Sequence, residues 1–269
     1  MNKLNVTMIV TGFPSVENMS HGIFNKKAAD QLSNLVNLTV IHLRIWKPGR
    51  KFFSKGNSES YKHYIISAPY IPFKENKFLS FPIILYNRLA SGKLKQVLEE
   101  TQVFHSVGAS FSGALGALWS EKYNIPHVLQ IIGTDVNTEL PLLIDQPYFK
   151  RIKTHTQGVG CNSRALMVQY EKLMGKVENI EVIYRGIDLS QYHLQENVST
   201  ENLRFLYLGG LPDYRETQYG INLKGGVTLM DAWSKIDDKL KSSNCELVFA
   251  GPDSDTKLAA DWKDRLSSR

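Results

Sequence analysis

Glycines and a lysine in the last third of the chain are spaced as a phosphate site requires. Gly209 and Gly210 directly follow a short β-rich run, and Lys224, Gly225 and Gly226 precede a helix-length segment. Glycine lets the backbone approach a phosphate closely, a helix N-terminus offers N–H groups, and lysine adds a positive charge. The pattern predicts an anion site. The alternative is that the glycines only form turns and that Lys224 is solvated.

Two further turns follow β-rich runs. They are Arg185-Gly186-Ile187-Asp188, after the run that ends at Tyr184, and Gly251-Pro252, after the run Glu246–Ala250. Ligands of doubly wound sheets bind at the carboxyl ends of the strands, so we expect both turns to lie at that edge. Two other polar residues have a simple structural interpretation. His105 could be packed at a strand end, and Asp135 could only cap the segment that follows it.

The elements that would position these residues alternate along the chain. Short apolar runs predict strands at Asn5–Val10, Leu38–Leu43, Tyr64–Ala68, Val103–His105, His127–Ile132, Val159–Cys161, Glu181–Tyr184, Arg204–Leu208 and Glu246–Ala250. Helix-length segments follow many of them, at Ile23–Leu35, Ser110–Tyr123, Arg164–Met174, Val227–Leu240 and Lys257–Leu266. Nearly continuous apolar runs are typical of strands buried in parallel sheets, and the alternation predicts βαβ units in a doubly wound α/β fold.

Two of these helices carry a more specific prediction. The spacing in Ile23–Leu35 places Phe24, Ala28, Leu32 and Leu35 on one face, which we expect to be buried. Ser163 precedes Arg164–Met174 and suits the N-cap of that helix.

A polar segment near Ser190–Asn202 separates two α/β series. The strand Arg204–Leu208 starts the second series. We therefore expect a first domain over residues 1–195 and a second over residues 203–269. Domains usually run to about 100–150 residues, so the second is expected to be an incomplete Rossmann-like domain.

Taken in order, eight short motifs resemble those of family 4 retaining glycosyltransferases. They are Gly22-Ile23-Phe24, Val103-Phe104-His105, Gly133-Thr134-Asp135, Asn162-Ser163, Ile183-Tyr184-Arg185-Gly186-Ile187-Asp188, Leu208-Gly209-Gly210-Leu211, Lys224-Gly225-Gly226 and Phe249-Ala250-Gly251-Pro252. The resemblance covers nearly the whole chain. It implies the GT-B fold, in which two Rossmann-like domains form the active site between them.

The resemblance also implies roles for individual residues. Gly22 matches a glycine whose backbone approaches the donor phosphates, and Lys224 matches the lysine that neutralises the leaving diphosphate. The predicted catalytic residues are His105, Asp135 and Lys224. The predicted donor-binding residues are Gly22, Gly209, Gly210, Arg215, Lys224, Gly225 and Gly251, and the predicted substrate-binding residues are Thr134, Asp135 and Ser163.

The chain departs from the family pattern at three places. Ile132 stands where the family often has histidine, and Gly210 stands where it often has arginine. Arg215, in the segment that follows, is a candidate to replace that arginine. The family's later glutamate pair, which holds the ribose and the sugar, lies beyond the end of this sequence.

These features predict a metal-independent glycosyltransferase. It would move a sugar from a nucleoside-diphosphate sugar, as a donor substrate and not a cofactor, to a saccharide or lipid-linked acceptor in polysaccharide or cell-envelope glycan synthesis. Two alternatives are a non-catalytic sugar- or nucleotide-binding protein or inactive fragment, and a nucleotide-sugar epimerase. A dehydrogenase is disfavoured because Gly158-Val159-Gly160 lacks the third glycine of the dinucleotide motif.

Positive charge is concentrated in one region of the chain. Ten basic and two acidic side chains lie from Lys47 to Lys95, a net charge of +8, whereas the whole chain carries +6. Aromatic residues interleave with the lysines and arginines, which suits anionic lipid head groups. The alternative is a basic surface over ordinary core aromatics, and no recognised module indicates nucleic acid. Without a signal peptide or an apolar run of about 18 residues, the chain is expected to be cytoplasmic or peripheral at the inner membrane face.

Overall fold

The structure is a computed structural model whose contacts divide the chain into two compact units, Met1–Gly186 and Ile187–Arg269. It describes residues 3–16, 19–69, 80–191, 203–209, 225–241, 245–250, 260 and 264. The predicted domain boundary, residues 195–203, falls outside these ranges except for its last residue.

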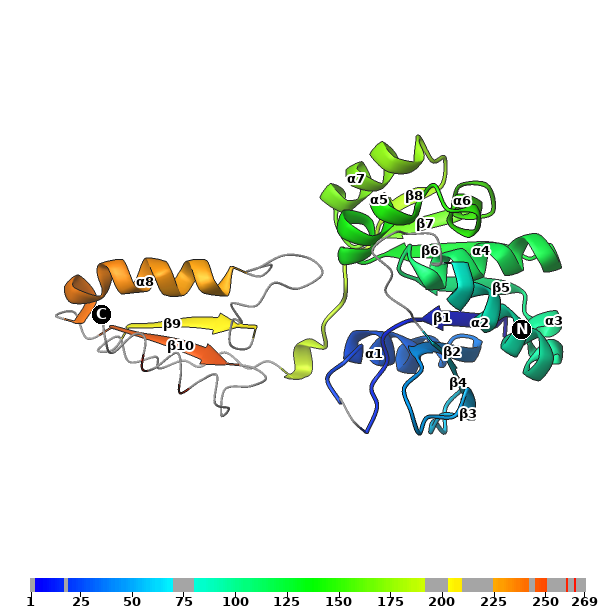
Figure 1. The fold of residues 1–269 in the computed structure, drawn as a ribbon, viewed down its shortest axis with the longest axis horizontal. Helices are drawn as coiled ribbons and strands as arrows, with labels where there is room; N and C mark the ends of the chain where they lie inside the picture. Colours follow the sequence, from blue (N-terminus) through cyan, green and yellow to red (C-terminus); the bar gives the residue numbers. More distant parts are fainter. Residues whose placement is uncertain are drawn as a thin grey trace. The chain divides into compact units, whose positions relative to one another are not determined.

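The first unit is built on one eight-stranded sheet with the order β3-β4-β2-β1-β5-β6-β7-β8 (Figure 1). Its strands are β1 (Asn5–Val10), β2 (Asn37–Ile45), β3 (Phe53–Lys55), β4 (Lys62–Ala68), β5 (Val103–Val107), β6 (His127–Ile131), β7 (Gly158–Cys161) and β8 (Ile180–Val182). Every strand predicted in this unit is confirmed, with small differences at the ends.

One strand of this sheet was not predicted. The three-residue β3 pairs antiparallel with β4, whereas every other pair in the sheet is parallel. A run as short as Phe53–Lys55 has no recognisable alternation, so only its pairing with β4 identifies it as a strand. The sheet is therefore parallel except at this edge.

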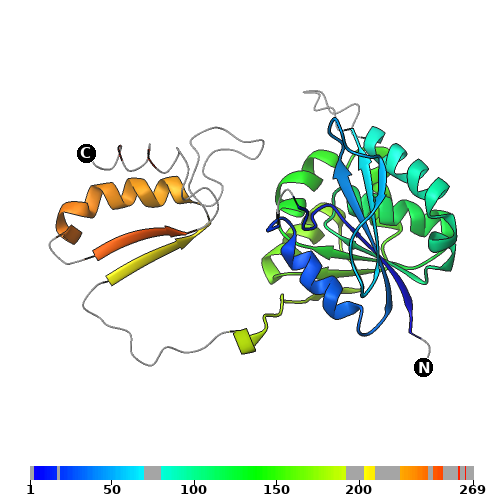
Figure 2. The ribbon, with the colours of Figure 1, turned by 90° about the horizontal axis from the view of Figure 1, so that it is seen from below.

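Helices cover both faces of the sheet (Figure 2). They are α1 (Ile23–Leu32), α2 (Ser80–Lys93), α3 (Lys95–Glu100), α4 (Phe111–Tyr123), α5 (Leu140–Leu143), α6 (Pro147–Thr154) and α7 (Arg164–Met174), with a π-helical turn at Asp135–Glu139 before α5. The residues of β1 divide between two hydrophobic clusters, because successive side chains point to opposite faces. Met8 and Val10 join the cluster that contains Ala29 of α1, and Ile9 joins the cluster that contains Ile83 of α2.

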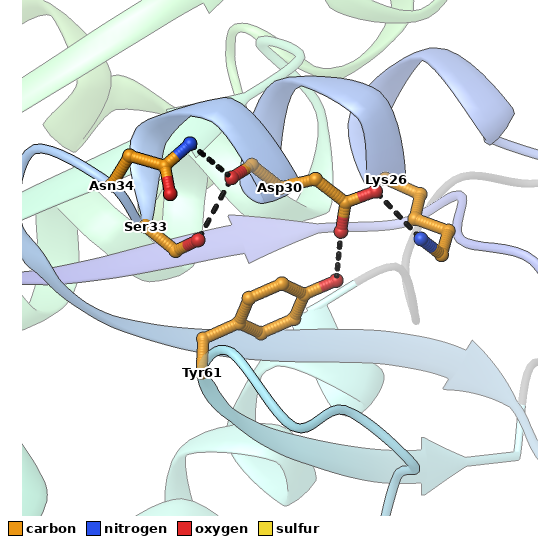
Figure 3. Close-up of polar contacts among 5 residues, drawn as sticks. All are labelled: Lys26, Asp30, Ser33, Asn34 and Tyr61. Atoms are coloured by element: carbon orange, nitrogen blue, oxygen red, sulfur yellow. Dashed lines mark hydrogen bonds and ion pairs between the residues drawn. The ribbon is translucent and has the colours of Figure 1, made fainter.

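The buried face of α1 differs from the predicted one. Ala29 is buried, whereas Phe24 is 59% exposed and Leu35, which lies beyond the helix end, is 73% exposed. A polar contact holds the helix instead (Figure 3): the Tyr61 hydroxyl donates to Asp30 Oδ1 at 3.1 Å, and Lys26 Nζ lies 2.6 Å from Asp30 Oδ2. Because Tyr61 directly precedes β4, this contact joins α1 to the start of β4.

The second unit contains a parallel pair of strands and a helix. Strand β9 (Leu203–Leu208) pairs with β10 (Cys245–Ala250), and α8 (Gly226–Lys241) lies between them in the sequence. The rings of Phe205 and Trp233 meet edge to face at 5.6 Å, which packs α8 against β9. Most of β9 is exposed, so the expectation of strands buried on both faces does not hold for β9. No described helix of either unit is long and apolar enough to cross a membrane.

Candidate active site

The first sheet has the strand order at which open α/β folds bind ligands, at the carboxyl ends of two neighbouring strands. Strand β1 has β2 on one side and β5 on the other, so the chain winds outward in both directions from this point. The loops that follow β1 and β5 therefore diverge at the edge, which is the usual ligand position in such folds. Apart from His105, the candidate site residues of the first unit lie in these loops and in those after β6 and β7.

Gly22 holds a backbone position that no other residue could occupy without strain. Its φ is +68°, and a Cβ atom there would lie 2.2 Å from the carbonyl carbon of Gly12 and 2.5 Å from the amide nitrogen of Phe13. The two ends of the loop after β1 therefore touch backbone to backbone. Gly22 also starts α1, so it presents the beginning of the helix at the sheet edge.

The carboxylate of Asp135 joins two of the loops. Oδ2 accepts a hydrogen bond from the Ala109 amide at 2.9 Å, and Oδ1 accepts from the amides of Gly133 at 2.6 Å and Ile132 at 3.2 Å. The side chain is only 3% exposed. Asp135 therefore anchors the loop after β6 to the loop after β5, and its oxygens are committed to backbone amides that precede it in the sequence and not to the segment that follows it.

The neighbouring predicted residues lie beside this anchor. Thr134 is exposed and directly precedes the π-helical turn. Ser163 caps α7 as predicted, because its hydroxyl accepts from the Leu166 amide at 3.3 Å. Gln130 of β6 donates to the Asn162 side chain at 3.1 Å and so links the ends of β6 and β7.

His105 lies inside β5 and not after it. It pairs with Met8 of β1 and Val128 of β6. Burial lowers its pKa to about 4, although a hydrogen bond with Gln130 acts in the opposite direction. The imidazole is therefore neutral near pH 7, and the side chain is partly buried within the sheet.

An arginine without an assigned role lies at the same edge. The guanidinium of Arg185 sits over the ring of Phe24, 4.9 Å from its centroid. Burial lowers the pKa of Arg185, and the negative charge of Asp135 acts against that shift. Arg185 belongs to one quoted motif and Phe24 to another, but no signal in the sequence indicates that the two side chains meet.

Further histidines are buried in the first unit, and two of them lie beside the loop after β1. The rings of His42 and His63 lie on β2 and β4 beside Phe13. Burial lowers the pKa of His42 to about 3 and that of His63 to about 4. His127 lies under α4, where its Nε2 is 2.9 Å from the Ser106 hydroxyl oxygen, and burial lowers its pKa to about 3. These histidines are neutral parts of the core at physiological pH.

In the second unit, the structure describes only two of the glycines that were predicted to bind the donor, Gly209 and Gly225. The Gly209 amide donates to the Ala250 carbonyl at 3.2 Å, which closes the end of the β9–β10 pair. Gly225 has a φ of +76° and directly precedes α8, so glycine is required there. The predicted residues Gly210, Arg215, Lys224 and Gly251 lie outside the described residues. Within the described ranges, no group of three or more His, Cys, Asp or Glu side chains is arranged to hold a metal ion.

The sequence matches no protein-family model. It is 26% identical over 92% of its length to TuaC of Bacillus subtilis (strain 168), provisionally named a teichuronic acid biosynthesis glycosyltransferase. The chain spans 65% of that protein, slightly less than two thirds.

Solved structures share the architecture at low sequence identity. HepE of Anabaena, in complex with UDP and glucose, superposes with a TM-score of 0.57 at 13% identity, over 99% of this chain and 67% of HepE. Sucrose-phosphate synthase of Thermosynechococcus elongatus superposes with a TM-score of 0.59 at 14% identity, over 98% of this chain and 67% of that protein. For the trehalose 6-phosphate synthase of Burkholderia multivorans the TM-score is 0.57 at 12% identity, over 100% of this chain and 69% of that protein. With the eight-stranded sheet, these similarities confirm the predicted fold class: the chain has an α/β fold of the GT-B type.

Proposed function

We propose that this chain belongs to a glycosyltransferase that moves a sugar from a nucleoside-diphosphate sugar to a saccharide or lipid-linked acceptor. The observation that carries the proposal is its GT-B-type fold, shared over 99% of the chain with a protein that holds UDP and glucose. The similarity to TuaC favours an acceptor in polysaccharide or cell-envelope glycan synthesis. Gly22 and the loop anchored by Asp135 lie at the sheet edge where ligands of such folds bind.

The chemical requirement of this reaction is stabilisation of the leaving diphosphate. Negative charge develops on its oxygen as the bond to the sugar breaks, and a preorganised cation stabilises the transition state more than the ground state. We assign that role to Lys224, which precedes the glycines that lead into α8. Asp135 acts as a positioning residue, because it holds Thr134 and the amides around it in place.

Replacement of Lys224 tests this assignment. In steady-state kinetics, we expect Lys224→Ala to lower kcat by about a hundredfold or more, with a smaller change in KM for the donor. Lys235→Ala is the matched control, because Lys235 is an exposed lysine of α8, in the same unit. Near wild-type turnover of Lys224→Ala at saturating donor would show that the phosphate site is elsewhere.

Two finer features of the reaction are also proposed. We propose that the anomeric configuration of the sugar is retained, which NMR of the isolated product reports directly. We propose that side-chain cations neutralise the diphosphate without a metal, so activity should survive excess EDTA. An inverted product would refute the first feature, and loss of activity that Mg²⁺ restores would refute the second.

The alternative functions make distinct predictions for the same assays. A nucleotide-sugar epimerase would change the donor without any acceptor, which NMR of the donor alone would reveal. A non-catalytic binding protein would bind the donor and leave it intact in the presence of every acceptor. Ile132 and Gly210 replace two residues common in the family and favour this second alternative.

We also propose peripheral contact with an anionic membrane at the cytoplasmic face. The segment between β2 and β3 supports it, because Trp46 stacks on Phe52 with ring centroids 5.3 Å apart and Phe52 is 46% exposed. Lys47 and Lys51 are exposed in the same segment. Each basic residue that engages the anionic surface should contribute about 1 kcal/mol to the binding free energy. Salt screens this attraction, so binding to anionic vesicles should fall as the salt concentration rises. Equal binding to neutral vesicles would contradict the proposal.

A further inference from the structure

Arg185 occupies a place that packing alone does not explain. It follows β8, the last strand of the first sheet, and its guanidinium lies over Phe24, the second residue of α1. The Phe24 ring is 59% exposed and so contributes little to the core. The contact joins the loop after β8 to the start of the helix that Gly22 begins.

The donors of Arg185 are available to a ligand. Among the residues that the structure describes, no hydrogen bond or ion pair is recorded between its guanidinium and another side chain. The negative charge of Asp135 acts on Arg185, and the oxygens of Asp135 already accept from three backbone amides. Arg185 therefore lies near a negative charge and does not donate its own N–H groups to it.

An arginine presented this way suits a phosphate group. Its planar guanidinium carries five N–H donors that can bind two phosphate oxygens at once, and its charge persists at any physiological pH. The aromatic ring beneath it restricts its orientation and leaves the edge of the guanidinium open. Gly22, whose backbone approaches the loop after β1, lies two residues from Phe24 on the same helix end.

We propose that Arg185 binds the leaving diphosphate of the donor at its β-phosphate, with Phe24 as a positioning residue. The assignment rests on the proposed glycosyl transfer. It predicts that Arg215 is not needed for contact with the β-phosphate.

The proposed reaction transfers the sugar from the diphosphate to the acceptor hydroxyl. The bond between the sugar carbon and the β-phosphate oxygen breaks, and its electron pair stays on that oxygen. The acceptor hydroxyl oxygen forms the new bond to the carbon, and its proton passes to the diphosphate. Arg185 donates hydrogen bonds to the β-phosphate as its charge grows, so its contribution is larger in the transition state than in the bound donor.

Calorimetric titration of the full chain tests which phosphate group of the nucleotide Arg185 contacts. UDP, GDP, ADP and CDP, each with its monophosphate, and inorganic pyrophosphate serve as probes, and the diphosphate that wild type binds best is carried forward. We expect Arg185→Ala to lower the affinity for that diphosphate about tenfold or more, and the affinity for the monophosphate less than about threefold. Arg185→Lys should restore only part of the loss, because lysine cannot bind two oxygens in a fixed plane. Arg88→Ala, which removes an exposed arginine of α2, is the control.

Phe24→Leu tests the positioning role. It removes the ring and keeps an apolar side chain, so the melting temperature should stay within about 2 °C of wild type while diphosphate affinity falls about threefold to tenfold. In kinetics with the natural donor, Arg185→Ala should lower kcat more than it raises KM.

The outcomes distinguish the two proposals. Wild-type binding of a diphosphate that Arg185→Ala leaves unchanged overturns the role of Arg185 and leaves the proposed function intact. Equal weakening of monophosphate and diphosphate also overturns it, because Arg185 would then not contact the β-phosphate. Failure of wild type to bind any of the probes overturns the proposed function, and the role of Arg185 with it.

Discussion

Asp135→Asn is the substitution whose effect follows most directly from the structure. It keeps the size of the side chain and removes its charge. The amide oxygen can still accept from Gly133 and Ile132, but the amide NH2 then faces the Ala109 N–H, which now lies 2.9 Å from Oδ2. Two donors would meet at a side chain that is only 3% exposed.

The expected cost combines two effects. A hydrogen bond to a charged group contributes about 1.5–3 kcal/mol, and a buried N–H left without an acceptor costs about 1–3 kcal/mol. A total near 3 kcal/mol corresponds to a fall in melting temperature of about 6–12 °C for a unit of this size. Asp135→Ala should cost more, because all three amides then lose their acceptor.

Thermal unfolding followed by circular dichroism measures this effect. Asp145→Asn is the matched control, since it makes the same chemical change at an exposed aspartate and should shift the melting temperature by less than about 2 °C. If Asp135→Asn melts within about 1 °C of wild type, Asp135 is not the anchor between the two loops. Turnover of Asp135→Asn should also fall, because Thr134 and its loop would lose their fixed position.

Two further predictions concern the backbone and the pH. Gly22→Ala should destabilise the chain by several kcal/mol, because its Cβ would overlap the Gly12 carbonyl, whereas Gly49→Ala, at a similar φ but in open space, should cost about 1 kcal/mol. Urea unfolding compares them, and equal losses would contradict the close approach at Gly22. Acid should also destabilise the fold: burial lowers the pKa of His42 and His63 to about 3 and 4, so the unfolded chain takes up protons first and stability falls as the pH drops below about 6.5. At pH 5 each of these histidines should contribute a loss of about 2 kcal/mol, and urea midpoints that do not differ between pH 7 and pH 5 would refute this.

The sequence alone determined the parallel strands and their order along the chain, together with α1, α4, α7 and α8, but not the helices α2, α3, α5 and α6. Nearly continuous apolar runs predicted every parallel strand that the structure describes. In the first sheet the reason is that a central strand buried on both faces must be apolar along its length, whereas β9 is mostly exposed. The helix Arg164–Met174 was predicted to the residue, since Ser163 marks its start through a bond to an amide three residues away. Such signals are local, and neighbours along the chain are enough to produce them.

Only the tertiary structure decided which residues meet at the sheet edge. Asp135 reaches Ala109 because β5 and β6 are adjacent in the sheet, and Arg185 reaches Phe24 although their segments lie far apart in the sequence. The short strand β3 exists only through its pairing with β4, and α1 buries Ala29 while the predicted Phe24 stays exposed. The physical reason is that strand order and helix rotation are set by the packing of the whole unit, which the periodicity of a single segment does not contain.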